Sequence, residues 1–376
     1  MGDSGWSVDR AVAGADFLEW NFSIRADGSP WSVEQAMTQL LAYQSAEGLC
    51  LRLAVAARED ATIIHELGRR RTPQAVAALR AFEAMSPIDT QRELARANAD
   101  RLVGQGLPEP AWGATIGRVR LDGCWWAHDE FAETVLVLCA FSYQGDDAHG
   151  ILLMIDRVIE GGLVRQLTLG TDPDLLRAAL RDTTDTQPGF VTEPLDPAYA
   201  RRLIEDAVAT SDEVFEDQGY DPSTAPPAYR KMRALILARA RALSADPAPP
   251  EPLPDSVELD LVKRAFLASA PACGLPVTDV TVRAVDLLVA HVMREAGGHP
   301  VRLGPRRVLA VLGLPDLTPD ELGDPDVGRV LPDVAEAWVS WTAAERGLPG
   351  DAAQRLVRAA REACEPLRSG PGPAAG

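Results

Sequence analysis

Apolar residues recur at helical spacing between residues 31 and 110. Val76, Leu79 and Phe82 follow one another at intervals of three, which keeps them near one face of a helix. Thr72 stands before them and is followed by proline, a pair typical of a helix start. The hydroxyl can cap the first amides, and proline loses nothing at the first helical position. We therefore expect a helical region over 31–110.

The first helix of this region is predicted to begin at Ser32. Ser32 is a good cap residue, and Gln35 stands three positions later, at the spacing of a capping box. Residues 1–30 are assigned to an N-terminal arm. They contain no basic segment followed by an apolar one, so we expect no secretory signal there.

The pattern changes to alternation beyond residue 110. The segment "ETVLVLCAFSY" is apolar on both of its alternating faces, which predicts a strand covered on both sides. The breaks between successive strands, "QGDDA" and "IEGG", are short and contain glycine, as in hairpins. Trp125 and Trp126 are adjacent and should point to opposite faces of their strand. We expect an antiparallel meander of four to five strands, with flanking helices, over 111–245.

Helical patterns resume after the meander. Asp172 and Asp196 each precede a proline and a helical segment, which predicts two capped helix starts. The proline-rich stretch 246–255 predicts a stiff linker. Residues 256–365 show apolar periodicity throughout and predict an all-helical domain, and the Gly- and Pro-rich end, 366–376, predicts a disordered tail. The predicted fold class is α+β: a mainly helical protein with a central antiparallel meander and a helical C-terminal domain.

Charge and cysteine content indicate which classes of partner and which cellular compartment to expect. The 376-residue chain has a formal net charge of −18, and no long segment is basic. Nucleic acid and anionic membranes both select positive surfaces, so neither is a favoured partner. No apolar run is long enough to span a bilayer. The five cysteines form no CxxC pair, which is typical of a cytoplasmic protein without a structural zinc site.

The stretch "CWWAHDEF" places three ionisable residues side by side, His128, Asp129 and Glu130. A catalytic acid/base site would need such residues, and these three are the candidate catalytic set. However, the meander places them at a hairpin turn, where polar residues are common for local hydrogen-bonding reasons. The polar turn is the favoured interpretation.

Strand direction decides which other residues can join this turn. His149 begins the third strand at the far end of the sheet, roughly 30 Å away at about 3.3 Å per residue, and cannot share a metal with the turn. Asp156 returns to the same end, where Glu133 also lies. Asp129, Glu133 and Asp156 are thus the candidate ligands of a divalent metal. An ion pair between Asp156 and Arg165, across the next hairpin, is the competing interpretation.

No established catalytic motif is present. The sequence lacks a phosphate-binding loop, a GxGxxG dinucleotide motif, a GxSxG elbow and an SxxK pair, so it leaves open whether the protein is an enzyme. The favoured hypothesis is a cytoplasmic interaction or regulatory protein with a protein partner and unknown oligomeric state. The alternative is a metal-dependent phosphoester hydrolase that uses the acidic cluster, the only case that needs a cofactor. A weaker alternative is a DNA-binding regulator that reads DNA through Arg302, Arg306 and Arg307 in the C-terminal domain.

Overall fold

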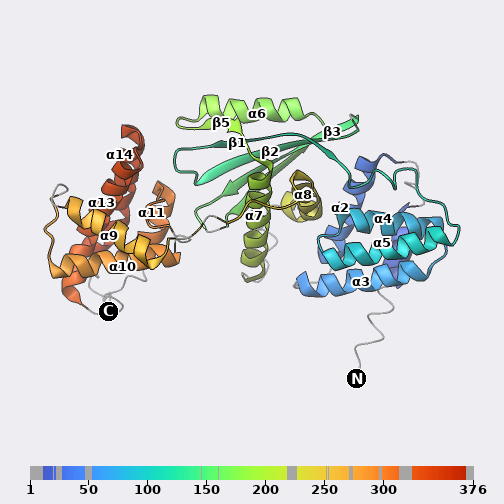
Figure 1. Cartoon of the computed structure of the whole chain (residues 1–376), viewed down its shortest axis with the longest axis horizontal. Coiled ribbons are helices and arrows are strands. Elements are labelled where there is room, and N and C mark those ends of the chain that lie inside the picture. Colours follow the sequence, from blue (N-terminus) through green and yellow to red (C-terminus); the bar gives the residue numbers. More distant parts are fainter. Residues whose placement is uncertain are drawn as a thin grey trace, which may run out of the picture.

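A central β-sheet lies between two groups of helices (Figure 1). Helices from the first 104 residues lie at one end of the molecule, and helices from residues 256–369 lie at the other. This computed structural model describes residues 12–19, 21–22, 28–46, 53–144, 146–159, 161–217, 227–250, 252, 254–270, 274–295, 299–312 and 324–369. The predicted α+β class is confirmed.

The sheet has five strands, each antiparallel to its neighbours, in the order β4-β3-β2-β1-β5. Their bounds are β1 Arg120–His128, β2 Thr134–Tyr143, β3 Asp146–Asp156, β4 Leu163–Gly170 and β5 Val191–Pro194. The first four strands form the predicted meander. β5 lies beyond the segment in which strands were predicted. It joins the opposite edge of the sheet because helix α6 (Pro173–Thr186) crosses one face between β4 and β5.

Both faces of the sheet are covered, as the alternation in β2 predicts. Val137 belongs to the core beneath helices α7 (Pro197–Asp217) and α8 (Pro227–Leu243), whereas Leu138 packs with Leu180 of α6. The two tryptophans separate in the same way. Trp126 packs on the α7–α8 side, and Trp125 packs on the α6 side.

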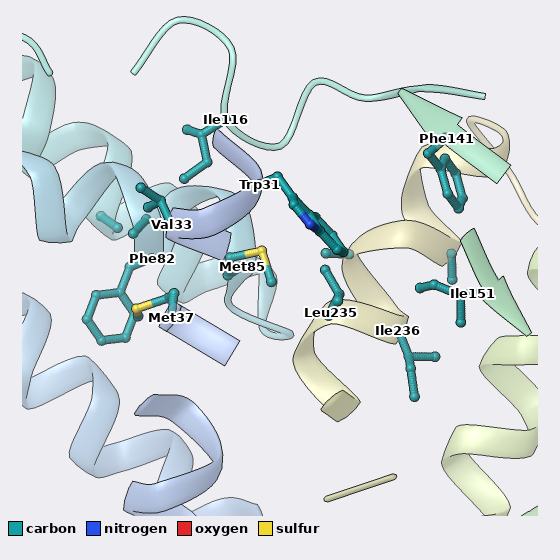
Figure 2. Close-up of a cluster of buried hydrophobic side chains, with 14 of the residues drawn as sticks. Trp31, Val33, Met37, Phe82, Met85, Ile116, Phe141, Ile151, Leu235 and Ile236 are labelled. Atoms are coloured by element: carbon teal, nitrogen blue, oxygen red, sulfur yellow. The ribbon is translucent and has the colours of Figure 1, made fainter. Parts of the chain in front are cut away.

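The N-terminal helices share one hydrophobic core with the sheet. These helices are α2 Pro30–Ala46, α3 Leu53–Arg69, α4 Pro73–Met85 and α5 Asp89–Gly104. Figure 2 shows side chains of α2 and α4 on one side, Phe141 and Ile151 of the sheet on the other, and Leu235 and Ile236 of α8 between them. Because α8 bridges the two groups, the regions predicted as 31–110 and 111–245 form one folded unit.

Two predictions about the N-terminal region need correction. Helix α2 does not begin with Ser32 as its cap: Pro30 is the first helical residue, and the Ser29 hydroxyl accepts the Ser32 N–H at 3.3 Å. Proline at the first position and serine before it thus start the helix three residues earlier. The predicted arm is also partly helical. Residues 12–19 form a helix whose Ala15 and Leu18 are buried in the shared core.

The C-terminal helices enclose a core of their own. They are α9 Ser256–Ser269, α10 Asp279–Glu295, α11 Pro305–Leu312, α13 Pro325–Glu345 and α14 Gly350–Ser369. Phe266 lies with its ring centroid 4.9 Å from that of Trp338 and 5.7 Å from that of Trp341. Helix α14 continues through residues 366–369, which were predicted to belong to the disordered tail. The rest of that predicted tail, 370–376, lies outside the described residues.

The linker is attached to α7 over its first part. The Ala248 N–H donates to the carbonyl of Ala198 at 2.9 Å, and just before the linker Arg201 donates to the carbonyl of Ala245 at 2.6 Å. None of the described helices has both the length and the apolar character needed to cross a lipid bilayer.

Candidate functional site

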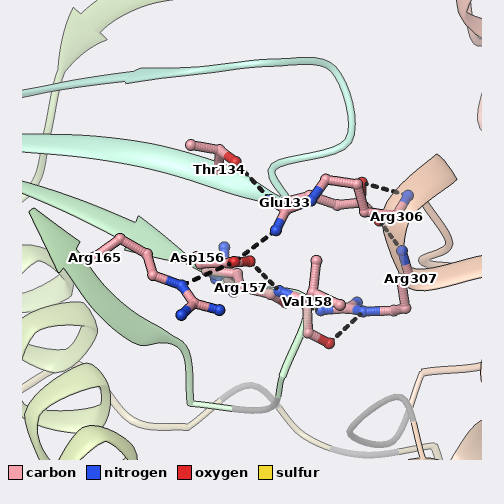
Figure 3. A network of polar contacts seen from close by, with 8 residues as sticks. All are labelled: Glu133, Thr134, Asp156, Arg157, Val158, Arg165, Arg306 and Arg307. Carbon is pink, nitrogen blue, oxygen red and sulfur yellow. Dashed lines mark hydrogen bonds and ion pairs between the residues drawn. The ribbon is translucent and has the colours of Figure 1, made fainter. Parts of the chain in front are cut away.

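The ionisable residues singled out in the sequence lie where the sheet meets the C-terminal domain. The turn between β1 and β2 and the end of β3 form the sheet side of this junction, and the N-terminus of α11 forms the other side (Figure 3). We call the contacts of Glu133, Asp156, Arg306 and Arg307 the interdomain contact.

Glu133 caps helix α11 from another part of the chain. Its carboxylate accepts the backbone N–H of Arg306 at 3.0 Å and that of Arg307 at 2.7 Å. A helix N-terminus leaves its first amides without partners and favours negative charge, so a carboxylate is well suited there. Glu133 is only 3% exposed, and this burial raises its pKa although the two amides act in the opposite direction.

Gly304 makes this close approach possible. A Cβ atom at position 304 would lie 2.3 Å from the Glu133 carboxyl carbon, much closer than atoms can pack. Any larger residue would displace the Glu133 carboxylate from the helix end. The glycine therefore belongs to the construction of the interdomain contact.

Asp156 forms ion pairs with two arginine side chains. Its carboxylate accepts from Arg165 at 3.2 Å, which confirms the predicted ion pair, and from Arg306 at 2.6 Å. It also accepts the Val158 N–H at 3.2 Å. Burial alone would raise the pKa of Asp156, but the bonds from Arg306 and Val158 hold that pKa below its usual value. The carboxyl therefore stays ionised as the partner of Arg306.

The contact extends along the turn through backbone carbonyls and one aromatic ring. Arg307 donates to the carbonyls of Val158, at 3.4 Å, and Arg157. Phe131 packs against the core of the C-terminal domain. Arg346 lies 5.9 Å from the centre of its ring and donates to the Glu130 carbonyl at 3.1 Å. The turn is thus bound mainly by guanidinium groups.

The predicted catalytic set does not assemble as one site. His128 turns toward β5, where its Nε2 lies 3.1 Å from the Glu193 carboxylate. Asp129 accepts the Glu133 N–H at 3.3 Å and so stabilises its own turn. Its pKa is raised, mainly by burial. Glu130 forms an ion pair with Arg355 of α14. Each of these three side chains therefore has a different protein partner.

The predicted metal ligands Asp129, Glu133 and Asp156 are likewise divided. Glu133 and Asp156 are both bonded to Arg306, whereas Asp129 is bonded within its turn. Among the residues that the structure describes, no group of three or more His, Cys, Asp or Glu side chains could hold a metal ion. The residues lie at the same end of the sheet, as strand direction predicted, but cations of the protein itself occupy that end.

Two of the three arginines proposed to read DNA, Arg306 and Arg307, bind the protein itself, whereas Arg302 is exposed. Arg306 and Arg307 both donate to the sheet end, and Arg307 also donates to the Arg302 carbonyl at 3.0 Å. Their pairing with Glu133 and Asp156 was not predicted from the sequence, because 150 to 174 positions separate the partners along the chain. No local pattern signals a contact at that separation.

A second ionisable cluster escaped sequence analysis. Arg239 of α8 is 2% exposed and forms an ion pair with Glu34 of α2, which is 0% exposed. Its Nε donates to Nε2 of His149 at 2.9 Å, and its guanidinium donates to the Tyr143 hydroxyl at 3.3 Å. Burial and Arg239 lower the pKa of His149 to about 4. The cluster joins α2, α8 and two strands and is closed to solvent.

Comparisons with protein-family models, with curated proteins and with solved structures find no match for this chain.

Proposed function

We propose that this is a non-catalytic interaction protein of the cytoplasm that binds a basic protein partner through helix α9 of its C-terminal domain. The observation that carries the proposal is an apolar stripe left uncovered along α9. It consists of Val257, Leu261, Ala265 and Ala268, spaced so that they share one helix face.

The two largest side chains of the α9 stripe are mostly exposed to solvent. Val257 is 61% exposed and Leu261 is 56% exposed, whereas Phe266 on the opposite face is fully buried. Single exposed apolar residues are ordinary, but apolar residues gathered on one surface indicate an interaction site. The helix itself is firmly started by a capping box of Asp255 and Glu258, so the stripe sits on a rigid element.

The acidic charge beside the stripe and on the whole chain indicates the kind of partner. Asp255, Glu258 and Asp260 are exposed beside the first half of the stripe. The whole chain carries a formal net charge of −18, which opposes the approach of a second copy. A partner with an apolar surface bordered by lysine or arginine side chains complements both features.

The sheet end plays a different part in this proposal. Its carboxylates hold the C-terminal domain against the sheet and so fix the direction in which α9 faces. The geometry gives no support to the metal-dependent hydrolase hypothesis, because an ion at Asp156 or Glu133 would have to displace the α11 contacts. It gives none to DNA binding either, because Arg306 and Arg307 are engaged with the sheet end.

A pair of serine substitutions on the stripe tests the proposal. The double variant V257S/L261S removes exposed apolar surface without opening a cavity, and L175S is the matched control on α6, where Leu175 is 67% exposed. We expect wild type and L175S to retain the same basic protein from a cell extract. Because burial of each such side chain contributes about 1.5–3 kcal/mol, the double variant should bind the purified partner at least about tenfold more weakly by calorimetry.

Two results would overturn the proposal. One is equal affinity of the partner for the double variant and the wild type. The other is a concentration-dependent dimer, seen by light scattering, that the double variant abolishes, because the stripe would then bind a second copy of this chain.

A further inference from the structure

A pocket rich in arginine lies between the N-terminal helices and α8. It has a volume of about 260 Å³ and lies between α4, α5, the turn at 113–118 and α8. Its walls carry four arginines, Arg80, Arg92, Arg118 and Arg241. In a chain of net charge −18, this concentration of positive charge requires an explanation.

Two of the four arginines are already neutralised by carboxylates. Arg80 forms ion pairs with Glu109 at 2.6 Å and with Glu83 and Asp100 at 2.8 Å each. Glu83, the single acidic residue in the pocket wall, is thereby engaged. Arg92 is paired with Asp89 and donates to the Ser86 carbonyl at 2.9 Å.

The guanidinium groups of the other two arginines have no acidic partner among the residues that the structure describes. Arg118 is exposed, and within the described part of the chain its guanidinium makes no hydrogen bond or ion pair. The Arg241 guanidinium makes one long hydrogen bond, 3.3 Å to the Ala84 carbonyl, and forms no ion pair with any described residue. Burial, with Arg92 close by, lowers the pKa of Arg241 to about 10. A charged group held in such surroundings is stabilised when an anion enters.

The pocket wall is fixed rather than collapsible. Gly117 has a φ of +73°, and a Cβ there would lie 3.1 Å from the Ala84 side chain, so the turn passes close to α4 only because this residue is glycine. The Gly117 N–H donates to the buried Glu34 carboxylate at 2.8 Å, which ties the turn to the Arg239 cluster. On the facing wall, Ala238 and Ala242 lie one turn apart on α8 and leave room beside Arg241.

We propose that this arginine pocket binds a small organic ligand through a phosphoryl group held by Arg118 and Arg241. The site is separate from the α9 stripe and independent of the function proposed for it. Arginine presents a planar fork of donors that pairs well with phosphate oxygens. Arg118 comes from a turn and Arg241 from a helix, so they approach from different walls and suit an oxyanion with several oxygens rather than a flat carboxylate.

The rest of the pocket selects the size and character of the ligand. Its volume lies below the roughly 300–1,000 Å³ typical of drug-sized ligands, so the ligand must be small. Ile116, Ala238 and Ala242 offer an apolar surface next to the arginines. A phosphoryl group with a compact apolar body fits this combination.

Calorimetry on the full chain with two matched probes tests the proposal. Phenyl phosphate carries the phosphoryl group, and benzoate carries a carboxylate on the same ring. We expect phenyl phosphate to bind with a Kd below about 1 mM and benzoate at least about tenfold more weakly. R118Q and R241Q should each raise the Kd of phenyl phosphate at least about tenfold. R181Q makes the same charge change at exposed Arg181 of α6 and should leave the Kd within about twofold.

Three results would overturn the proposal: no heat with phenyl phosphate at millimolar concentration, equal loss of binding in R181Q, or equal affinity for benzoate. If R241Q fails to fold, R118Q still decides the matter, because Arg118 is exposed and its replacement removes no internal contact. Loss of partner binding at α9 would leave all of these outcomes unchanged, so the two proposals fail separately.

Discussion

At the scale of single residues, His149 shows how burial fixes a charge state. Its ring stacks on Trp31 with centroids 3.9 Å apart. Nε2 accepts from Arg239, and Nδ1 lies 2.8 Å from the carbonyl of Asp147, so the proton belongs on Nδ1. Protonating Nε2 as well would break the bond from Arg239 and place two cations together. Burial of the ring, together with the nearby charge of Arg239, therefore lowers the pKa of His149 from 6.5 to about 4.

The lowered pKa of His149 predicts acid sensitivity. Above pH 6.5 the ring is neutral in both folded and unfolded chains, so stability is fully present. As pH falls from 6.5 toward 4, His149 binds a proton in the unfolded chain but not in the folded protein. The free energy of unfolding therefore decreases. Between pH 7.5 and 5 we expect a loss of about 2 kcal/mol from this residue alone.

Urea unfolding of H149Q at both pH values measures the effect. Glutamine can accept from Arg239 but does not titrate, so H149Q should lose about 2 kcal/mol less than wild type on acidification. H65Q changes exposed His65 on α3 and should keep the wild-type pH dependence. Equal acid losses in H149Q and wild type would contradict the assignment.

At the scale of elements, local chemistry sets the helix starts and the hairpins. The Thr72 hydroxyl accepts the Ala75 N–H at 3.1 Å, and Asp172 and Asp196 cap their helices in the same way, as the sequence predicted. The sequence also predicted the hairpin at Gly161 and Gly162. These features need only residues within a few positions of one another, so the sequence displays them directly.

Gly162 tests the backbone requirement of that hairpin. Its φ is +87°, and an added Cβ would lie 2.7 Å from Cγ2 of Ile155. Gly106 has a φ of +94° but nothing within 4 Å of an added Cβ. G106A should therefore lower the free energy of unfolding by only about 1 kcal/mol, the cost of a positive φ in alanine. G162A adds steric overlap and should lower the free energy of unfolding by about 2–3 kcal/mol. Thermal or urea unfolding of the two variants checks this, and equal losses would show that the overlap is relieved.

At the scale of the whole molecule, the two folded units meet through charged groups. Asp156, Glu133 and the α11 arginines form a polar junction, while the hydrophobic cores on either side remain separate apart from Phe131. Polar junctions between domains permit relative motion more readily than large apolar ones. The interdomain contact therefore decides how the C-terminal domain, and with it the α9 stripe, is held.

Gly304→Ala tests the interdomain contact. The new methyl group must push the Glu133 carboxylate off the α11 amides, which removes charge-assisted hydrogen bonds worth about 1.5–3 kcal/mol each. We expect a larger radius of gyration by small-angle X-ray scattering and faster proteolysis within the linker 246–255. G350A is the matched control in the same domain, because nothing lies within 4 Å of an added Cβ at Gly350. Identical scattering from both variants and wild type would contradict the assigned role of Glu133.

The sequence by itself determined most of the elements and their order, though not β5 or the helix at 12–19, together with contacts between near neighbours in the chain. The meander, both faces of β2, the pairing of Asp156 with Arg165 and the distance of His149 from the β1–β2 turn all follow from periodicity and strand direction. Only the tertiary structure decided what the acidic turn does. The arginines of the C-terminal domain that bind this turn and the end of β3 lie 150 to 225 positions from their partners along the chain, and Arg239 lies 205 positions from Glu34. Such contacts depend on how separate elements pack, and the sequence around each partner contains no signal that predicts them.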